Sequence, residues 1–256
     1  MNKNNPSISK LLDPRSGNKA AWIAAAFVAL LTFAVYLPAL QNGFVNWDDD
    51  ILVYENPYIR SIDFKLLGWD VTALTEMWVP LTMLSFALDY AVWGLNPKGY
   101  HLTNNIFHTL NTILVFILTI RLIGHAKPGK DRLGKEAIIA GSVTSILFGI
   151  HPLRVESVVW VTERKDVLYS FFFLLSILAY IKYVSINSKR MNYYAATLIL
   201  FIFALMSKLM AVSLPIVLLI LDFYPFRRFK IETGPRNILG VLLEKLPFLL
   251  SALPLS

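Results

Sequence analysis

Long apolar runs alternate with short polar segments along the 256-residue chain. A helix needs about 20 apolar residues to cross the hydrocarbon core of a bilayer, and several of these runs approach that length. We predict seven spans, at residues 20–40, 100–123, 137–150, 167–184, 193–206, 209–224 and 238–255. The first run is longer than the roughly 7–15 residues of a signal-peptide core, so we expect it to be a retained span. The pattern therefore predicts an all-α polytopic membrane protein.

The basic residues predict the orientation of these spans. When residues 1–19 form a cytoplasmic tail, most of the 24 Lys and Arg residues fall on the inner side, as the positive-inside rule requires. The apolar stretch 79–95 is then not a span, because an extra crossing would move the basic loop 121–135 outside. We expect this stretch to be an interfacial helix within a long first outer loop, residues 41–99.

Composition agrees with a membrane protein and excludes other classes. Hydrophobic residues make up 56% of the chain and charged residues 16%, whereas an ordinary soluble domain has about 25% charged residues. A disordered chain would be poorer in aromatic residues and richer in charge. The net charge of +7 reflects the inner loops, so we expect the lipid bilayer and no nucleic acid as a partner. The absence of cysteine excludes a thiolate zinc site and a Cys nucleophile.

An acidic cluster lies a few residues after the first predicted span. Asp48, Asp49 and Asp50 are adjacent, and their mutual repulsion in a partly desolvated site would raise a pKa or require a cation. This condition suits a general base, and it leaves room for a divalent cation at Asp48 and Asp49, although no cofactor follows firmly from the sequence. A solvated acidic loop is the alternative.

Basic residues on the predicted outer side could bind an anion. Arg154 and Lys165 are eleven residues apart and would return to one face of a continuous helix, with Arg164 beside them. Internal ion pairing with Glu156, Glu163 and Asp166, which would cancel the three positive charges, is the alternative.

Two other features are polar residues within or beside apolar runs. Lys208 stands between two predicted spans, where an ionisable residue indicates function but can also extend to the interface. His101 begins a polar stripe over residues 101–111 on one helical face, which favours interhelical hydrogen bonds over a metal site. Asp222 is expected to pair with Arg227 or Arg228.

Several short sequence blocks follow one another in a characteristic order and spacing along residues 35–230. They are Leu37-Pro38, Gly43 to Asp49, Asn56-Pro57, Pro80-Leu81-Thr82, Ser85 to Tyr90, Gly99 to Asn104, His108, His151-Pro152, Glu156-Ser157, Trp160 to Leu168 and Ser207-Lys208. Together they resemble the transmembrane and tetratricopeptide-repeat family of GT-C glycosyltransferases, in a bacterial-type member. The resemblance implies a GT-C-like transmembrane domain over residues 20–256.

The resemblance also implies an activity and a site. Such enzymes transfer a sugar from a polyprenyl-phosphate carrier to a hydroxyl of an acceptor protein or glycan on the outer face. The catalytic carboxylate would be Asp48 or Asp49. The lipid phosphate would be bound by residues among Arg154, Arg164, Lys165 and Lys208. Supporting roles would fall to Asp50, His151, Glu156, Glu163, Asp89 and His101.

The extent and location of the chain follow from the same resemblance. Members of the family continue into more spans and tetratricopeptide repeats that are absent from this chain, so we expect an amino-terminal membrane part. In a bacterium it would lie in the cytoplasmic membrane with its active site facing outward. The alternatives are a non-catalytic membrane scaffold, a transporter-like module and an inactive fragment of the enzyme.

Overall fold

The described part of the chain contains helices and their connections and no strand. The structure is a computed structural model that describes residues 19–62, 78–126, 134–186, 188–229 and 235–252. Its α-helices are α2 (Lys19–Val35), α4 (Pro80–Trp93), α5 (Pro97–Ala126), α6 (Lys135–Ile150), α7 (Val155–Val159), α8 (Arg164–Ser185), α9 (Arg190–Ser207), α10 (Leu214–Phe223), α11 (Pro235–Leu243) and α12 (Leu246–Ala252). Shorter turns are η1 (Leu37–Gln41), η2 (Asp50–Tyr54), η3 (Tyr58–Arg60), η4 (Pro152–Arg154) and η5 (Leu209–Ser213).

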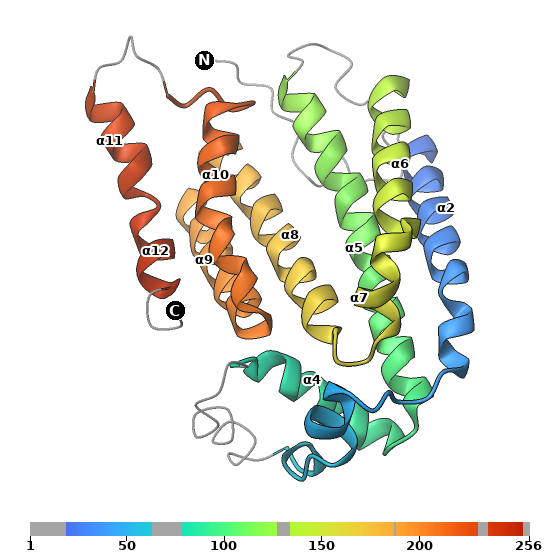
Figure 1. Cartoon of the computed structure of the whole chain (residues 1–256). Helices are drawn as coiled ribbons and strands as arrows, with labels where there is room; N and C mark the ends of the chain where they lie inside the picture. Colours follow the sequence, from blue (N-terminus) through green and yellow to red (C-terminus); the bar gives the residue numbers. More distant parts are fainter. Residues whose placement is uncertain (1–18, 63–77, 127–133, 187, 230–234, 253–256) are drawn as a thin grey trace.

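Most of the long helices form one bundle (Figure 1). Within the described ranges, 4 helices are long and apolar enough to cross a membrane: Lys19–Gln41, Pro97–Ala126, Arg164–Ser185 and Arg190–Ser207. The number rises to 5 when α6 and the segment Pro152–Val159, which are bent by 53° at a break, count as one span. The predicted class, an all-α polytopic membrane protein, is confirmed. The count of seven spans and their orientation stay predictions, and residues 1–18 of the predicted tail lie outside the described ranges.

The apolar stretch 79–95 forms α4, which lies across one end of the bundle (Figure 1). Pro80 occupies the first turn of α4, where its missing N–H is tolerated, and Gly94 ends the helix at a positive φ of 57°. The 14 residues of α4 extend about 21 Å, which is too short to cross the hydrocarbon core. A helix is therefore present where the sequence predicted one, with bounds close to those predicted, and its interfacial position stays a prediction.

Close helix contact fixes α2, α5 and α6 together at Gly149. A Cβ atom at this position would lie 2.5 Å from Thr32 Oγ1 and 3.0 Å from Thr112 side-chain atoms. Small residues allow membrane helices to approach in this way. The carbonyl oxygen of Gly149 lies 2.8 Å from His108 Nε2, which extends from the neighbouring helix α5. This contact therefore joins the backbone of α6 to the polar stripe of α5.

The polar stripe of α5 bonds to the backbone of its neighbours, as predicted. Asn105 donates to the carbonyl of Phe33 at 3.0 Å, and Asn111 donates to the carbonyl of Val167 at 2.8 Å. Asn104 donates to carbonyls at the end of α7 and in the turn between α7 and α8. Because these carbonyls belong to α2, α7, α8 and the turn before α8, the stripe fixes α5 relative to the elements that carry the site.

A second polar network joins the last two helices to the bundle. Asp222 is fully buried and lies 3.1 Å from Arg228 Nη1 and 2.7 Å from Lys245 Nζ. Tyr180 donates to Asp222 at 2.7 Å, and Lys245 donates to Tyr180 at 2.6 Å. Glu244 accepts two hydrogen bonds from Arg228 at 2.8 Å each. The expected pairing of Asp222 with a nearby arginine is confirmed for Arg228, while Lys245 is a partner that the sequence did not indicate.

Candidate functional site

Asp49 joins the loop after α2 to the turn before α8. Its side chain is buried, with the residue only 1% exposed. One carboxylate oxygen accepts from the N–H of Thr162 at 3.0 Å and from its hydroxyl at 2.6 Å. The other oxygen accepts from the N–H of Val45 at 3.0 Å. Both oxygens of Asp49 are therefore occupied by donors of the protein itself.

These three hydrogen bonds make Asp49 important for stability. We expect Asp49→Ala to lower the free energy of unfolding by about 3 kcal/mol, because it leaves buried donors of Thr162 and Val45 unpaired. Thermal unfolding in detergent, followed by circular dichroism, measures the change. The control is Glu55→Ala, an exposed carboxylate of the same loop, which should change stability by less than about 0.5 kcal/mol. Equal effects of the two variants would contradict the role of Asp49.

Asp48 is the more accessible of the two predicted catalytic carboxylates. Its side chain is 27% exposed and lies 3.8 Å from Lys165 Nζ. From Lys165 a row of alternating charges, the charge row, continues. Lys165 lies 3.1 Å from Glu163, Glu163 lies 3.6 Å from Lys208, and Lys208 contacts Asp166. The charge row links the loop that carries Asp48 to the turn between α9 and η5.

The neighbouring charges of the charge row also shift the pKa values of Glu163 and Lys208. Burial raises the pKa of the Glu163 carboxyl, and the charge of Asp166 adds to this effect, while Lys165 and Lys208 oppose it. Burial alone would lower the pKa of Lys208, but its hydrogen bond and ion pair with Asp166, together with Glu163, raise the pKa above its ordinary value. Lys208 therefore remains a cation throughout the physiological pH range.

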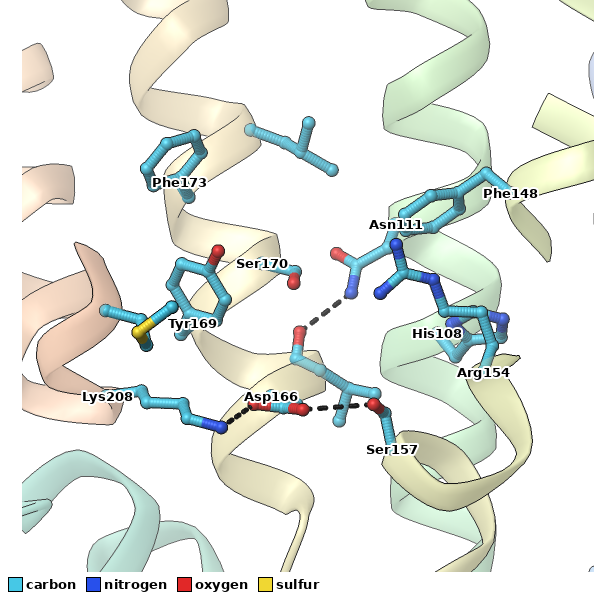
Figure 2. Close-up of a pocket in the computed structure, with 13 residues that line it drawn as sticks. His108, Asn111, Phe148, Arg154, Ser157, Asp166, Tyr169, Ser170, Phe173 and Lys208 are labelled. Carbon is cyan, nitrogen blue, oxygen red and sulfur yellow. Dashed lines mark hydrogen bonds and ion pairs between the residues drawn. The ribbon is translucent and has the colours of Figure 1, made fainter. Parts of the chain in front are cut away.

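A cavity of about 350 Å³ opens beside the charge row. Its walls come from α5, α6, η4, α7, α8 and the segment after α9, and the lining residues are His108, Asn111, Phe148, Arg154, Ser157, Asp166, Val167, Tyr169, Ser170, Phe173, Leu174, Lys208 and Met210. Figure 2 shows Lys208 and Arg154 on opposite sides of Asp166 and Ser157. Asp166 accepts from the Ser157 hydroxyl at 3.0 Å. The cavity is thus polar at Asp166 and apolar farther along α8, at Phe173 and Leu174.

Local contacts position the two cations of the cavity. The guanidinium of Arg154 lies over the ring of Phe148, 4.7 Å from its centroid. The Lys208 turn is fixed by α4, because Thr82 donates to the carbonyl of Ser207 at 3.1 Å. Arg154 and Lys208 therefore enter the cavity from two different elements, and each is supported by a contact to a third.

The other two predicted phosphate ligands lie elsewhere. The expectation that Arg154 and Lys165 share a face of one helix is wrong, because α7 ends at Val159 and α8 begins at Arg164. Lys165 points toward Asp48 and Glu163 instead. Neither Arg164 nor Lys165 lines the cavity.

Arg164 is fully buried and its donors are used inside the protein. It forms an ion pair with Asp89 at 2.6 Å, donates to the carbonyl of Tyr100 at 2.9 Å and contacts the side-chain oxygen of Asn104. A weaker contact reaches Ser85 at 3.3 Å. Arg164 and Asp89, both named as site residues from the sequence, therefore hold α4 and α5 against the start of α8.

The remaining predicted supporting residues are dispersed. His101 is buried in α5, and Glu156 is exposed at the start of α7. His151 is exposed, and its Nδ1 accepts from the N–H of Leu153 at 3.2 Å. Asp50 accepts from the N–H of Ile51 at 2.7 Å at the start of η2. None of these four residues lines the cavity.

The sequence left room for a divalent cation at Asp48 and Asp49. In the part of the chain that the structure describes, no group of three or more His, Asp or Glu residues is arranged to hold a metal ion. Both oxygens of Asp49 already accept hydrogen bonds from the protein.

Some residues of the site could not be recognised from the sequence. Thr162 and Ser157 lie within the sequence blocks of the resemblance, but the sequence gives neither a role. The structure does, because they donate hydrogen bonds to Asp49 and Asp166. Tyr169, Ser170 and Phe173 line the cavity on α8 but belong to an apolar run that predicts only a span. Their spacing of three and four residues was the one available sign that they share a helical face.

A bundle of apolar helices with a charged cavity at the end covered by α4 defines the class: a polytopic α-helical membrane protein with a polar site at one end. Within this class, the chain is related to the TMTC protein O-mannosyl-transferases, which confirms the resemblance seen in its sequence blocks. No family model and no solved structure matches the chain.

Three relatives illustrate the extent of the similarity. Protein O-mannosyl-transferase Tmtc2 of Drosophila melanogaster is 30% identical over 213 residues, which cover 77% of this chain and 21% of the relative. TMTC2 of Homo sapiens is 33% identical over 175 residues, 64% of this chain and 19% of the relative. TMTC3 of Mus musculus is 35% identical over 158 residues, 58% of this chain and 16% of the relative. The chain thus spans about a fifth of the length of the curated relatives it matches.

Proposed function

We propose that the chain is a GT-C-type glycosyltransferase module that moves a sugar, by analogy mannose, from a polyprenyl-phosphate carrier to a protein hydroxyl on the outer face of the membrane. The names of its relatives, which are protein O-mannosyl-transferases, support this proposal. The observation that carries it is the cavity itself, which combines two cations with an apolar extension along α8. A lipid phosphate is complementary to this cavity, because it joins an anionic head group to an apolar chain.

The cations of the cavity account for donor binding. Arg154 and Lys208 would bind the phosphate from opposite sides, since charge-assisted hydrogen bonds to phosphate are stronger than neutral ones. The isoprenoid chain would lie against Phe173, Leu174 and Met210, which are among the apolar residues of the wall. Asp166 would keep Lys208 in place through their ion pair.

Asp48 is the general base in this proposal. It would accept the proton of the acceptor hydroxyl, whose oxygen then forms a bond to the anomeric carbon of the sugar. The bond from that carbon to the phosphate oxygen breaks, and the bonding electrons remain on the phosphate. The cations stabilise the resulting charge, because fixed charges act strongly in a water-poor site. Asp49 is less suited to this role, since both its oxygens are occupied and the residue is only 1% exposed.

Transfer of labelled sugar tests the proposal. The purified chain in liposomes is supplied with polyprenyl-phosphate mannose and a Ser/Thr-containing acceptor peptide, and we expect label on the peptide. A nucleotide-linked mannose should not replace the lipid donor. Binding of the donor without transfer would favour a non-catalytic module, and failure to bind the donor would contradict the proposed site.

Arg154→Gln is the variant that tests the phosphate contact. We expect donor affinity to fall about tenfold or more, because one charge-assisted hydrogen bond to the phosphate contributes about 1.5–3 kcal/mol. Donor binding is measured by microscale thermophoresis, together with the unfolding temperature. Lys98→Gln removes an exposed cation at the start of α5 and serves as the matched control. A similar loss of affinity in both variants would indicate a general effect of charge and not a site at Arg154.

A further inference from the structure

Two cations lie between α5 and α8 at the ends of these helices that are remote from the cavity. Lys182, in the last turn of α8, is only 7% exposed. Arg121 of α5 is half-buried and close enough for its charge to repel that of Lys182. Burial and a neighbouring like charge both disfavour the charged form of Lys182, and a bound anion would offset both effects.

One hydrogen bond, a helical turn away, indicates on which sides of α5 and α8 the two cations lie. His125 Nε2 lies 2.9 Å from the Ser185 hydroxyl, which joins α5 to α8. Arg121 precedes His125 by four residues and Lys182 precedes Ser185 by three, so each cation lies on the same helical face as the contact residue. The two helices also run in the same direction (Figure 1). Arg121 and Lys182 therefore occupy corresponding positions one turn deeper in the bundle.

No carboxylate compensates this pair among the residues that the structure describes. The acids of the nearby network are already engaged, Asp222 with Arg228 and Lys245, and Glu244 with Arg228. Arg121 and Lys182 have no ion pair or hydrogen bond to a side chain within the described ranges. Two cations with free donors, one of them almost completely buried, are the feature expected of an anion site.

We propose that Arg121 and Lys182 bind the phosphate of an anionic phospholipid, in the leaflet opposite the cavity. A guanidinium can bind two phosphate oxygens at once, and an ammonium supplies a further charge. Leu118 and Leu178 lie one turn deeper on the two helices and are partly buried, so they provide apolar surface for an acyl chain. Basic pockets between membrane helices bind lipid head groups in this way. The adjoining apolar surface favours a lipid over free phosphate.

Native mass spectrometry of the 256-residue chain tests this site. The protein is released from nanodiscs that contain equal amounts of phosphatidylglycerol and phosphatidylcholine, and the lipids that stay bound are counted. We expect one phosphatidylglycerol to be retained, and Lys182→Gln or Arg121→Gln to reduce that retention at least about tenfold. Lys182→Arg should keep it. Lys19→Gln removes an exposed cation at the start of α2 and should leave retention unchanged.

Two further comparisons distinguish a lipid from free phosphate as the ligand and show whether a variant has lost the site or has unfolded. Inorganic phosphate at millimolar concentration should neither displace the lipid nor raise the unfolding temperature. Displacement would overturn the proposal that the ligand is a lipid and would indicate a site for a free anion. Added phosphatidylglycerol should raise the unfolding temperature of the wild type and not that of Lys182→Met, which removes the buried charge and should fold. Equal retention of both lipids by the wild type, or unchanged retention in Lys182→Met, would overturn the proposal.

Discussion

Asp48→Asn is expected to lower kcat for sugar transfer about 10²–10⁴-fold, the range in which a positioned general base contributes. The substitution keeps the size of the side chain and removes its ability to accept a proton. Its structural effect should be small, because the Asp48 side chain is 27% exposed and its ion partner Lys165 lies 3.8 Å away. Initial rates with saturating polyprenyl-phosphate sugar and acceptor peptide measure the change.

The neighbouring carboxylates make this prediction specific. Glu55→Gln, at an exposed acid of the same loop, should transfer sugar at the wild-type rate. Asp49→Asn should lower the unfolding temperature, because the amide group replaces one of the oxygens that accept from Thr162 or Val45. Full activity of Asp48→Asn would remove Asp48 from the chemistry. Donor affinity measured for the same variant shows whether binding and catalysis have been separated.

The sequence predicted those features that depend on local pattern. Apolar runs indicated α2, α5, α6, α8 and α9 with bounds within a few residues, since the bilayer imposes a minimum length of apolar sequence. The positive-inside rule, which uses the loops on both sides, predicted that α4 is not a span, and the 14 residues of α4 are too few for one. The polar stripe of α5 was recognisable because its spacing repeats on one helical face.

The features that the sequence could not give depend on contacts between distant segments. Nothing near Arg164 indicates that Asp89, 75 residues away, is its partner. The same holds for Asp49 and Thr162, which are separated by 113 residues. In a sequence, two arginines or two carboxylates of the same predicted loop look equally available for chemistry. Burial separates them: Arg154 and Asp48 are accessible, whereas Arg164 and Asp49 hold the fold together.

Arg164→Met is expected to lower the free energy of unfolding by about 3–5 kcal/mol, the range for removal of one partner from a buried ion pair. The variant leaves the Asp89 carboxylate without its cation, and it also removes the donors to Tyr100 and Asn104 that join α5 to the start of α8. Chemical unfolding in detergent micelles, followed by tryptophan fluorescence, measures the loss.

Two further variants distinguish this structural role from the phosphate binding that the family resemblance implies. The double variant Arg164→Met/Asp89→Leu should recover part of the lost stability, because the unpaired carboxylate is removed together with its partner. Arg154→Met, at an exposed arginine on the cavity wall, should retain the stability of the wild type and lose donor affinity. If Arg164→Met kept its stability and lost only donor affinity, the roles of the two arginines would be reversed: Arg164 would bind the phosphate, which requires a path to it that its complete burial now closes.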